Sequence, residues 1–341
     1  MNENIIKATQ NILEKNLQIG TGFYSESPVV LIYDTDSRLS TAIAEGYKYQ
    51  IQKLSRGECI YINEIEKDTL IEKLKNLPEF STVILVQSTN FRLEDFRIRM
   101  TLQKQGVGCL EHNHLSYIKE TEFDTYIDSI AYRGKEYTRL SGKLKDIADN
   151  AQTAKFICSD GSCLNISGGF EDMKQNIGNY SPEKRGSTLP LGENFSEAFD
   201  FDKVNGELSI TCYPDSNFNI HFCEPFTIHI KNSLIECHDE KCPKIFREFL
   251  DKIAGNEGGI VYLRELGFGL NPAISNSNPL NDVNAFERKA GFHFSMGKKH
   301  GIYRKKFHRK EIQRYHIDVF PDIQSIYFDD MLVFQDGKYV I

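Results

Sequence analysis

The hydrophobic pattern of this 341-residue chain changes its period near residue 150, and this change limits the folds available to the chain. Before that point, short apolar runs alternate with amphipathic segments of helical period. The apolar runs are 28–34, 59–62, 82–88 and 106–111, and the clearest helical patterns are 37–54 and 65–77. Strands that alternate with helices predict a parallel sheet covered on both faces. We therefore expect an α/β open-sheet domain over residues 1–130.

The second part of the chain has a different hydrophobic pattern. From residue 154 onward, apolar and polar residues alternate in short runs that are separated by turn residues. Period-two alternation predicts an antiparallel or mixed sheet, which one helical pattern, 242–255, interrupts. A longer helical pattern, 126–152, connects the two parts. We expect an α+β domain over residues 131–341.

Composition excludes several classes of protein. Hydrophobic residues make up 40% of the chain and charged residues 26%, as in ordinary globular proteins. The chain has no apolar run of about 18 residues and no signal-peptide core at its start, which predicts a cytoplasmic protein without a membrane partner. A net charge of -7 argues against a nucleic-acid partner. The chain also lacks the glycine-rich fingerprints of nucleotide-binding loops. Its eight cysteines form no C-x-x-C pair, which predicts reduced thiols rather than a zinc knuckle.

Five acidic or imidazole side chains in the second part lie in short apolar runs or beside glycine: Glu193, Glu265, His293, His316 and Asp318. In a strand, His316 and Asp318 share one face, which permits both to bind one metal ion. Glu265 lies in "IVYLRELGFG", where a buried carboxylate is costly without a cation. Each residue has a simpler explanation, as a surface pair or a core histidine. Together they form an oxygen and nitrogen ligand set that suits Zn, Co, Mn or Fe(II), and they suffice for two adjacent ions.

The order and local context of these residues resemble the thermophilic metallo-aminopeptidase family (aminopeptidase T and leucyl aminopeptidase). The similar stretches are "LPLGENFSEAF", "LRELGFGLNPAI", "AGFHFSMG" and "YHIDVF", and the resemblance is clearest over residues 150–341. It implies an aminopeptidase T-like fold, a homodimer and a two-metal site. In that site Glu193, Glu265 and His293 would bind one ion, and Glu265 would bridge to a second ion bound by His316 and Asp318.

One position departs from the family pattern. In the peptidases a catalytic tyrosine lies seven residues after the first histidine ligand; this chain has His300 there, and the nearest tyrosine is Tyr303. The resemblance therefore offers His300 and Tyr303 as the catalytic residues. The surrounding segment 298–310 contains seven Lys or Arg in thirteen residues. It is either a recognition segment for a substrate carboxylate or phosphate, or a solvated loop.

Three functions are consistent with this sequence. The leading hypothesis is a metal-dependent hydrolase that cleaves a peptide or other amide bond with a metal-activated water. The superfamily also holds Fe(II) ring-cleaving enzymes of the 2,5-dihydroxypyridine dioxygenase type, which keep the H-x-D pair but carry histidine where this chain has Glu265. A mononuclear non-haem Fe(II) oxygenase is therefore the alternative. The third hypothesis is a non-catalytic homologue that binds a peptide in a biosynthetic pathway.

Overall fold

The computed structural model describes residues 2–24, 26–181, 185–297, 303 and 315–341. The chain divides into two compact units. The first unit comprises Met1–Lys135, Gly178–Leu191 and Asn276–Asp282; the second comprises Glu136–Ile177, Gly192–Ser275 and Val283–Ile341. None of the helices in the described residues is both long enough and apolar enough to cross a membrane.

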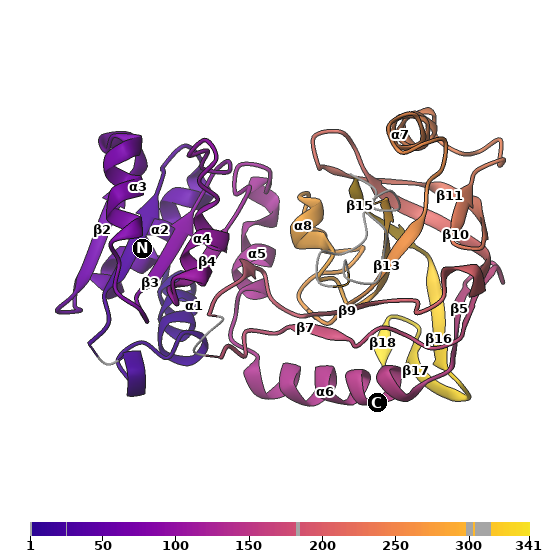
Figure 1. Ribbon diagram of the computed structural model, residues 1–341, viewed down its shortest axis with the longest axis horizontal. Helices are drawn as coiled ribbons and strands as arrows, with labels where there is room; N and C mark the ends of the chain where they lie inside the picture. The colour runs from indigo at the N-terminus through magenta and orange to yellow at the C-terminus, as the bar shows by residue number, and fades with distance from the viewer. Residues whose placement is uncertain (1, 25, 182–184, 298–302, 304–314) are drawn as a thin grey trace. The chain divides into compact units, whose positions relative to one another are not determined.

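The first unit is built on a five-stranded sheet in which all paired strands run parallel (Figure 1). The strand order is β2-β1-β3-β4-β8, with bounds β1 Val29–Tyr33, β2 Gly57–Tyr61, β3 Thr82–Val86, β4 Gly108–His112 and β8 Thr188–Leu189. The helices are α1 Glu3–Asn11, α2 Arg38–Ile51, α3 Lys67–Lys75, α4 Ile98–Lys104 and α5 Phe123–Ser129. The parallel sheet predicted from the first four apolar runs is present, and the short β8 joins it from a distant part of the chain.

Side chains from alternate positions of these strands form the core of the first unit. Val30 and Ile32 of β1 are buried in one cluster with Leu70 of α3 and Leu102 of α4. Strand residues that alternate in this way bury both faces of a sheet when helices cover both sides. Ser37 caps the start of helix α2, because its side chain accepts a hydrogen bond from the backbone N–H of Ser40. This cap satisfies a backbone donor that the helix leaves unpaired.

A histidine lies fully buried between two tyrosines in this unit. The Nε2 atom of His112 is 2.8 Å from the Tyr47 hydroxyl, and its Nδ1 atom is 2.8 Å from the Tyr126 hydroxyl. A neutral imidazole has one donor and one acceptor nitrogen, so the two hydroxyls can satisfy both. Burial lowers the pKa of His112 from 6.5 to about 3. The imidazole therefore stays neutral wherever the unit is folded above that pH.

This histidine is expected to make the first unit sensitive to acid. The unfolded chain binds a proton at His112 near pH 6.5 and the folded unit only near pH 3, so stability is lost as the pH falls between these values. Between pH 8 and pH 5 the loss is about 2 kcal/mol. Hydrogen exchange of β3 and β4 peptides, corrected for the intrinsic effect of pH, measures it. His112→Gln should flatten the pH dependence, whereas His221→Gln in the second unit should not. If the stability of β3 and β4 depends on pH equally in the natural protein and in both variants, this account is contradicted.

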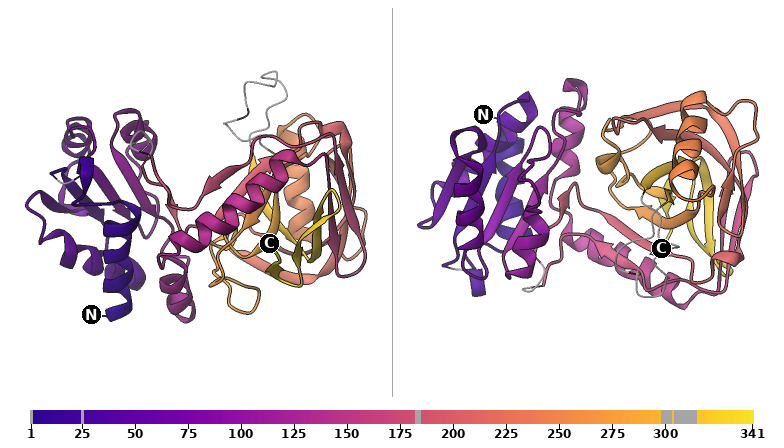
Figure 2. Two further views of the ribbon diagram at one scale, coloured as in Figure 1. Left: turned by 90° about the horizontal axis from the view of Figure 1, so that it is seen from below. Right: turned by 45° about the horizontal axis from the view of Figure 1, so that its top comes forward.

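The second unit contains a curled, antiparallel sheet of thirteen strands (Figure 2). One path through it runs β18-β17-β16-β5-β6-β10-β15-β14-β13-β9-β7, and β11 and β12 extend from β10. The strands before the last helix are β5 Thr153–Cys158, β6 Cys163–Ser167, β7 Lys174–Asn176, β9 Glu193–Glu197, β10 Val204–Pro214, β11 Ile220–Lys231, β12 Leu234–Glu236 and β13 Leu263–Gly269. The later strands are β14 Gly291–Gly297, β15 His316–Pro321, β16 Ile323–Phe328, β17 Met331–Gln335 and β18 Lys338–Tyr339. The helices are α6 Gly134–Asn150, α7 Lys244–Asn256 and α8 Val283–Phe286.

The helical pattern 126–152 is not one continuous helix, and that expectation was wrong. Helix α5 ends at Ser129, whose hydroxyl donates a hydrogen bond to the Tyr126 carbonyl, and α6 begins only at Gly134. A serine side chain that bonds to the backbone and a glycine both weaken a helix. The two helices also belong largely to different units, because the division between the units falls after Lys135.

Candidate metal centre

Four neighbouring strands of the second unit bring the predicted ligands to one face of the sheet. Across strands β9, β13, β14 and β15, Glu197 pairs with Glu265, Glu265 with Ser295, and Ser295 with Asp318. Directly paired residues point to the same side of a sheet, and so do residues two positions apart. Glu193, His293 and His316 therefore lie on this face as well, because each is separated from one of the paired residues by an even number of positions.

A glycine leaves the space that the His293 side chain occupies. Gly267 pairs with His293 between β13 and β14, and a Cβ atom added to Gly267 would overlap the imidazole ring. The imidazole therefore lies over the backbone of the neighbouring strand. A glycine inside a strand often marks such a close approach.

Three groups of side chains at this face have ligand atoms that all lie within 4.8 Å of one another. Two of them contain only predicted ligands: Glu193, Glu265 and His293 in one, and Glu265, His316 and Asp318 in the other. Glu265 belongs to both groups. The third group is Glu287, His293 and Asp318. The five predicted residues thus come together, and sequence reasoning missed Glu287.

The cluster fits a divalent cation. Glu193, Glu265, His293 and Asp318 are each at most 5% exposed. Four carboxylates, including that of Glu287, gather around two imidazoles, and such a buried concentration of acidic groups requires cations. The buried Oε2 atom of Glu265 forms no hydrogen bond with any described residue. A metal ion there would supply its missing partner, and carboxylate oxygen and imidazole nitrogen are the ligands that Zn, Mn, Co and Fe(II) accept.

An arginine that the sequence analysis did not identify holds two of the carboxylates. Arg288 forms ion pairs with Glu193 and, at 2.8 Å, with Glu287. The other oxygen of Glu193 lies 3.3 Å from Nε2 of His293. Although burial raises the pKa of Glu193, Arg288 and His293 lower it below its usual value. Glu193 is therefore ionised, with one oxygen fixed by the arginine and the other directed to the histidine.

Burial raises the pKa of both Glu265 and Asp318, but their neighbours make the net shifts opposite. Burial, with the nearby charges of Glu193 and Asp318, raises the pKa of Glu265 to about 8 against the opposing effect of His316. Burial opposes ionisation of Asp318 too, but His316, 3.3 Å from Oδ1, lowers its pKa. Partial desolvation lowers the pKa of His316, whose side chain is 35% exposed, but Asp318 raises it more. Without metal, this pair is an imidazolium and a carboxylate, so a metal ion must displace a proton from His316.

Loss of the arginine is expected to destabilise the metal-free protein. Arg288→Met leaves the buried carboxylates of Glu193 and Glu287 without their cation, which costs about 3–5 kcal/mol of unfolding free energy. Urea unfolding after chelation, followed by circular dichroism, measures this change. Arg247→Met is the matched control, because Arg247 is exposed and its guanidinium, among the described residues, donates only to backbone carbonyls of Asp239 and Glu240. If both variants unfold at the same urea concentration, Arg288 does not have the proposed role.

The two proposed catalytic residues differ in what the structure describes. His300, and the basic segment 298–310 apart from Tyr303, lie outside the described residues. Tyr303 is buried, and its hydroxyl donates a 2.7 Å hydrogen bond to the carbonyl oxygen of Asp172. Burial raises the pKa of Tyr303, and the carboxylates of Glu197 and Glu265 raise it further. Its hydroxyl therefore keeps its proton at neutral pH and lies within electrostatic range of Glu265.

Two missed residues carried a weak signal in the sequence. Glu287 and Arg288 lie in "AFERKAGF", where charged residues interrupt an otherwise apolar stretch just before β14. Glu287 also interacts with Asp318 by a side-chain hydrogen bond, and burial raises the pKa of Glu287 against the opposing charge of Arg288, with a further increase from Glu193 and Asp318. Charged residues beside buried ones are too common for this pattern alone to identify a ligand.

This chain is similar to known proteins in structure, but it matches no protein-family model and no curated sequence. A solved structure of 2,5-dihydroxypyridine dioxygenase from Pseudomonas putida is similar with a TM-score of 0.68 and 14% identity, over 100% of this chain and 98% of that one. AmpT from Thermus thermophilus is similar with a TM-score of 0.59 and 13% identity, over 99% of each chain. At these identities the likeness shows the fold, and it extends through both units.

Proposed function

We propose that this protein is a metal-dependent hydrolase of the aminopeptidase T type that cleaves a peptide or other amide bond. The observation that carries the proposal is the pair of ligand groups that share Glu265. A carboxylate common to two adjacent groups can bridge two ions, and paired ions are a recurrent arrangement in aminopeptidases. The full-length likeness to AmpT, an aminopeptidase, supports the same class.

Each residue has a distinct part in the proposed mechanism. When bound, two divalent ions would lower the pKa of a water molecule and polarise the carbonyl of the scissile bond. Glu193 and His293 would hold one ion, His316 and Asp318 would hold the other, and Glu265 could contribute to both groups. Arg288 keeps Glu193 ionised and oriented, as partners of metal ligands commonly do. We propose that the protonated hydroxyl of Tyr303 donates a hydrogen bond to the substrate. To do so, it must first break its hydrogen bond to the Asp172 carbonyl.

A second candidate is an oxygenase with one Fe(II) ion. The group Glu265, His316 and Asp318 supports it, because three side-chain ligands would leave coordination positions of an iron open for oxygen and substrate, although the usual set for such iron sites is two histidines and one carboxylate. Full-length likeness to a dioxygenase supports this class too. Against it, the described residues offer further ligands in Glu193, His293 and Glu287, which a single three-residue site does not use.

One experiment separates the two. The protein is purified without oxygen, stripped with a chelator and reloaded with Zn, Mn, Co or Fe(II). A hydrolase is expected to release 4-nitroaniline from aminoacyl 4-nitroanilides with about two metal equivalents and no oxygen uptake. An oxygenase is expected to bind about one iron and to consume oxygen in the presence of a dihydroxylated ring substrate. Oxygen uptake with a single iron would overturn the hydrolase proposal.

A further inference from the structure

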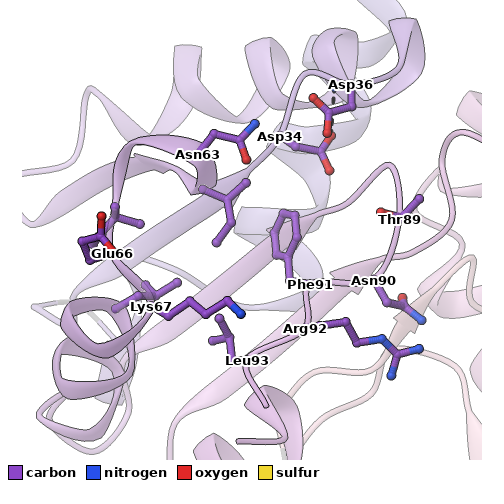
Figure 3. Close-up of a pocket in the computed structure, with 13 residues that line it drawn as sticks. Asp34, Asp36, Asn63, Glu66, Lys67, Thr89, Asn90, Phe91, Arg92 and Leu93 are labelled. Carbon is purple, nitrogen blue, oxygen red and sulfur yellow. Dashed lines mark hydrogen bonds between the residues drawn. The ribbon is translucent and has the colours of Figure 1, made fainter.

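A second candidate site lies in the first unit, at the carboxyl ends of its parallel strands. A cavity of about 370 Å³ opens there (Figure 3). Its lining comes from the segments that directly follow β1, β2 and β3 and from the start of α3, and includes Asp36, Asn63, Lys67, Phe91 and Leu93. None of these residues takes part in the metal centre, which belongs to the second unit.

The cavity lies where the order of strands reverses. From β1 the chain proceeds to β2 on one side and then crosses to β3 on the other side of β1. The connections leaving neighbouring strands therefore separate, which opens a crevice at the carboxyl ends. Open α/β sheets bind their ligands in this crevice.

A hydrogen-bonded acid fixes one wall of the cavity. Asp34 follows β1 and is 2% exposed. Its carboxylate accepts hydrogen bonds from the backbone N–H and the hydroxyl of Ser88, which follows β3, and the Ser88 hydroxyl oxygen lies 2.8 Å from the hydroxyl oxygen of Ser40 in α2. The N–H of Phe91 donates to Oε1 of Gln87 at 2.8 Å, which fixes the start of the next loop. The wall is therefore formed before any ligand arrives, which lowers the entropic cost of binding.

Two exposed charged side chains at this cavity form no ion pair and no hydrogen bond with the described residues. Their charged groups are the carboxylate of Asp36 and the amino group of Lys67. Figure 3 shows the Phe91 ring between Lys67 on one side and the pair Asp34 and Asp36 on the other. Ile62, Leu70 and Leu93 add apolar side chains to the lining. The cavity thus offers the amino group of Lys67, an aromatic face and, opposite Lys67, carboxylate acceptors.

The start of α3 strengthens the cationic end. Helix α3 has nine residues, its first turn carries Asp68, and no side chain caps that turn, so its first backbone N–H groups have no side-chain acceptor among the described residues. Backbone N–H groups and the positive end of the helix dipole therefore lie beside Lys67, an arrangement that favours an anion. The side chains of Glu66 and Arg92 lie at the rim and point away from the Phe91 ring (Figure 3).

We propose that this cavity binds a small molecule with a flat ring, an anionic group at one end and hydroxyl or amine donors at the other. The anion, a phosphate or a carboxylate, lies at Lys67 and the first turn of α3. The ring lies against Phe91, and the donors bond to Asp36 and Asn63. A cavity of about 370 Å³ is within the usual range for small-molecule sites.

Calorimetric titration of the full chain tests this site. The probes are AMP, which carries a phosphate, and 4-hydroxybenzoate, which carries a carboxylate; adenosine and inorganic phosphate each lack one half of the proposed ligand. At least one of the two anionic ring compounds is expected to bind saturably with one site per chain. The matching probe without the anion or without the ring should bind about tenfold or more weakly.

Variants decide whether the binding is at this cavity. Lys67→Met should weaken the binding of the anionic ring compound about tenfold, and Asp36→Asn should weaken it several-fold. Lys104→Met, at the exposed end of α4, and Glu265→Gln, in the metal centre, should leave it unchanged, which excludes a general charge effect and binding to metal. Circular dichroism confirms that each variant is folded. The proposal is overturned if neither ring compound binds, or if Lys67→Met and Lys104→Met bind equally well.

Discussion

Replacing Glu265 by glutamine is expected to abolish metal binding at both ligand groups and to lower turnover about a thousandfold. Glu265 is common to the two groups, so a single substitution removes a carboxylate ligand from each. A neutral amide oxygen is a far weaker ligand than a carboxylate, and the charge stabilisation supplied by metal ions is several kcal/mol, of which about 4 kcal/mol corresponds to a factor of a thousand. Plasma mass spectrometry of the reloaded protein gives the metal content, and the reaction rate gives the turnover.

The stability of the metal-free Glu265→Gln variant shows whether Glu265 acts as a metal ligand or only stabilises the fold. Burial raises the pKa of Glu265 to about 8, so the unfolded chain releases this proton near pH 4.5 while the folded protein retains it. Stability attributable to Glu265 therefore falls as the pH rises from 4.5 towards 8. The metal-free Glu265→Gln protein should be at least as stable as the natural protein at pH 8. A large loss of stability without metal, with metal content unchanged, would contradict the assignment.

Replacing Gly267 by alanine is expected to remove one metal ion and leave the other. The added methyl group overlaps the His293 imidazole, so the ring must leave the group that it forms with Glu193 and Glu265. The second group does not include His293, and its ligands His316 and Asp318 come from β15, two strands away from Gly267. Metal content should fall from about two equivalents to about one, and hydrolysis should fall about a hundredfold or more.

Gly142→Ala is the matched control for this substitution. Gly142 lies in α6, and a Cβ atom added there meets nothing within 4 Å. Alanine is the better helix former, so this variant should be slightly more stable and should keep both ions. If Gly267→Ala also retains both ions, the position of His293 does not define the first metal site.

Local sequence pattern predicts most elements of this fold because each strand carries its own periodicity. The run 82–88 predicts β3 at Thr82–Val86, and "GFHFSMG" corresponds to β14 at Gly291–Gly297. The return of Gly178–Leu191 and Asn276–Asp282 to the first unit has no local signal. These contacts join parts of the chain far apart in sequence, and only packing of the whole chain decides them.

The candidate site was predictable to the extent that its residues carry chemistry in a recognisable context. His316 and Asp318 share a face because strand side chains alternate, and Glu265 is conspicuous in an apolar run. The role of Gly267 follows only from its pairing with His293, which depends on strand register. Arg288 and Glu287 join the site from the turn before β14, where sequence does not reveal which way a side chain points.

The most direct test of the proposed centre is anomalous X-ray diffraction from crystals of the cobalt- or zinc-loaded protein. We expect two anomalous peaks in each chain, both within bonding distance of the Glu265 carboxylate, one also bound by Glu193 and His293 and the other by His316 and Asp318. A single peak bound by Glu265, His316 and Asp318 alone, or peaks that do not involve Glu265, would contradict the two-ion account.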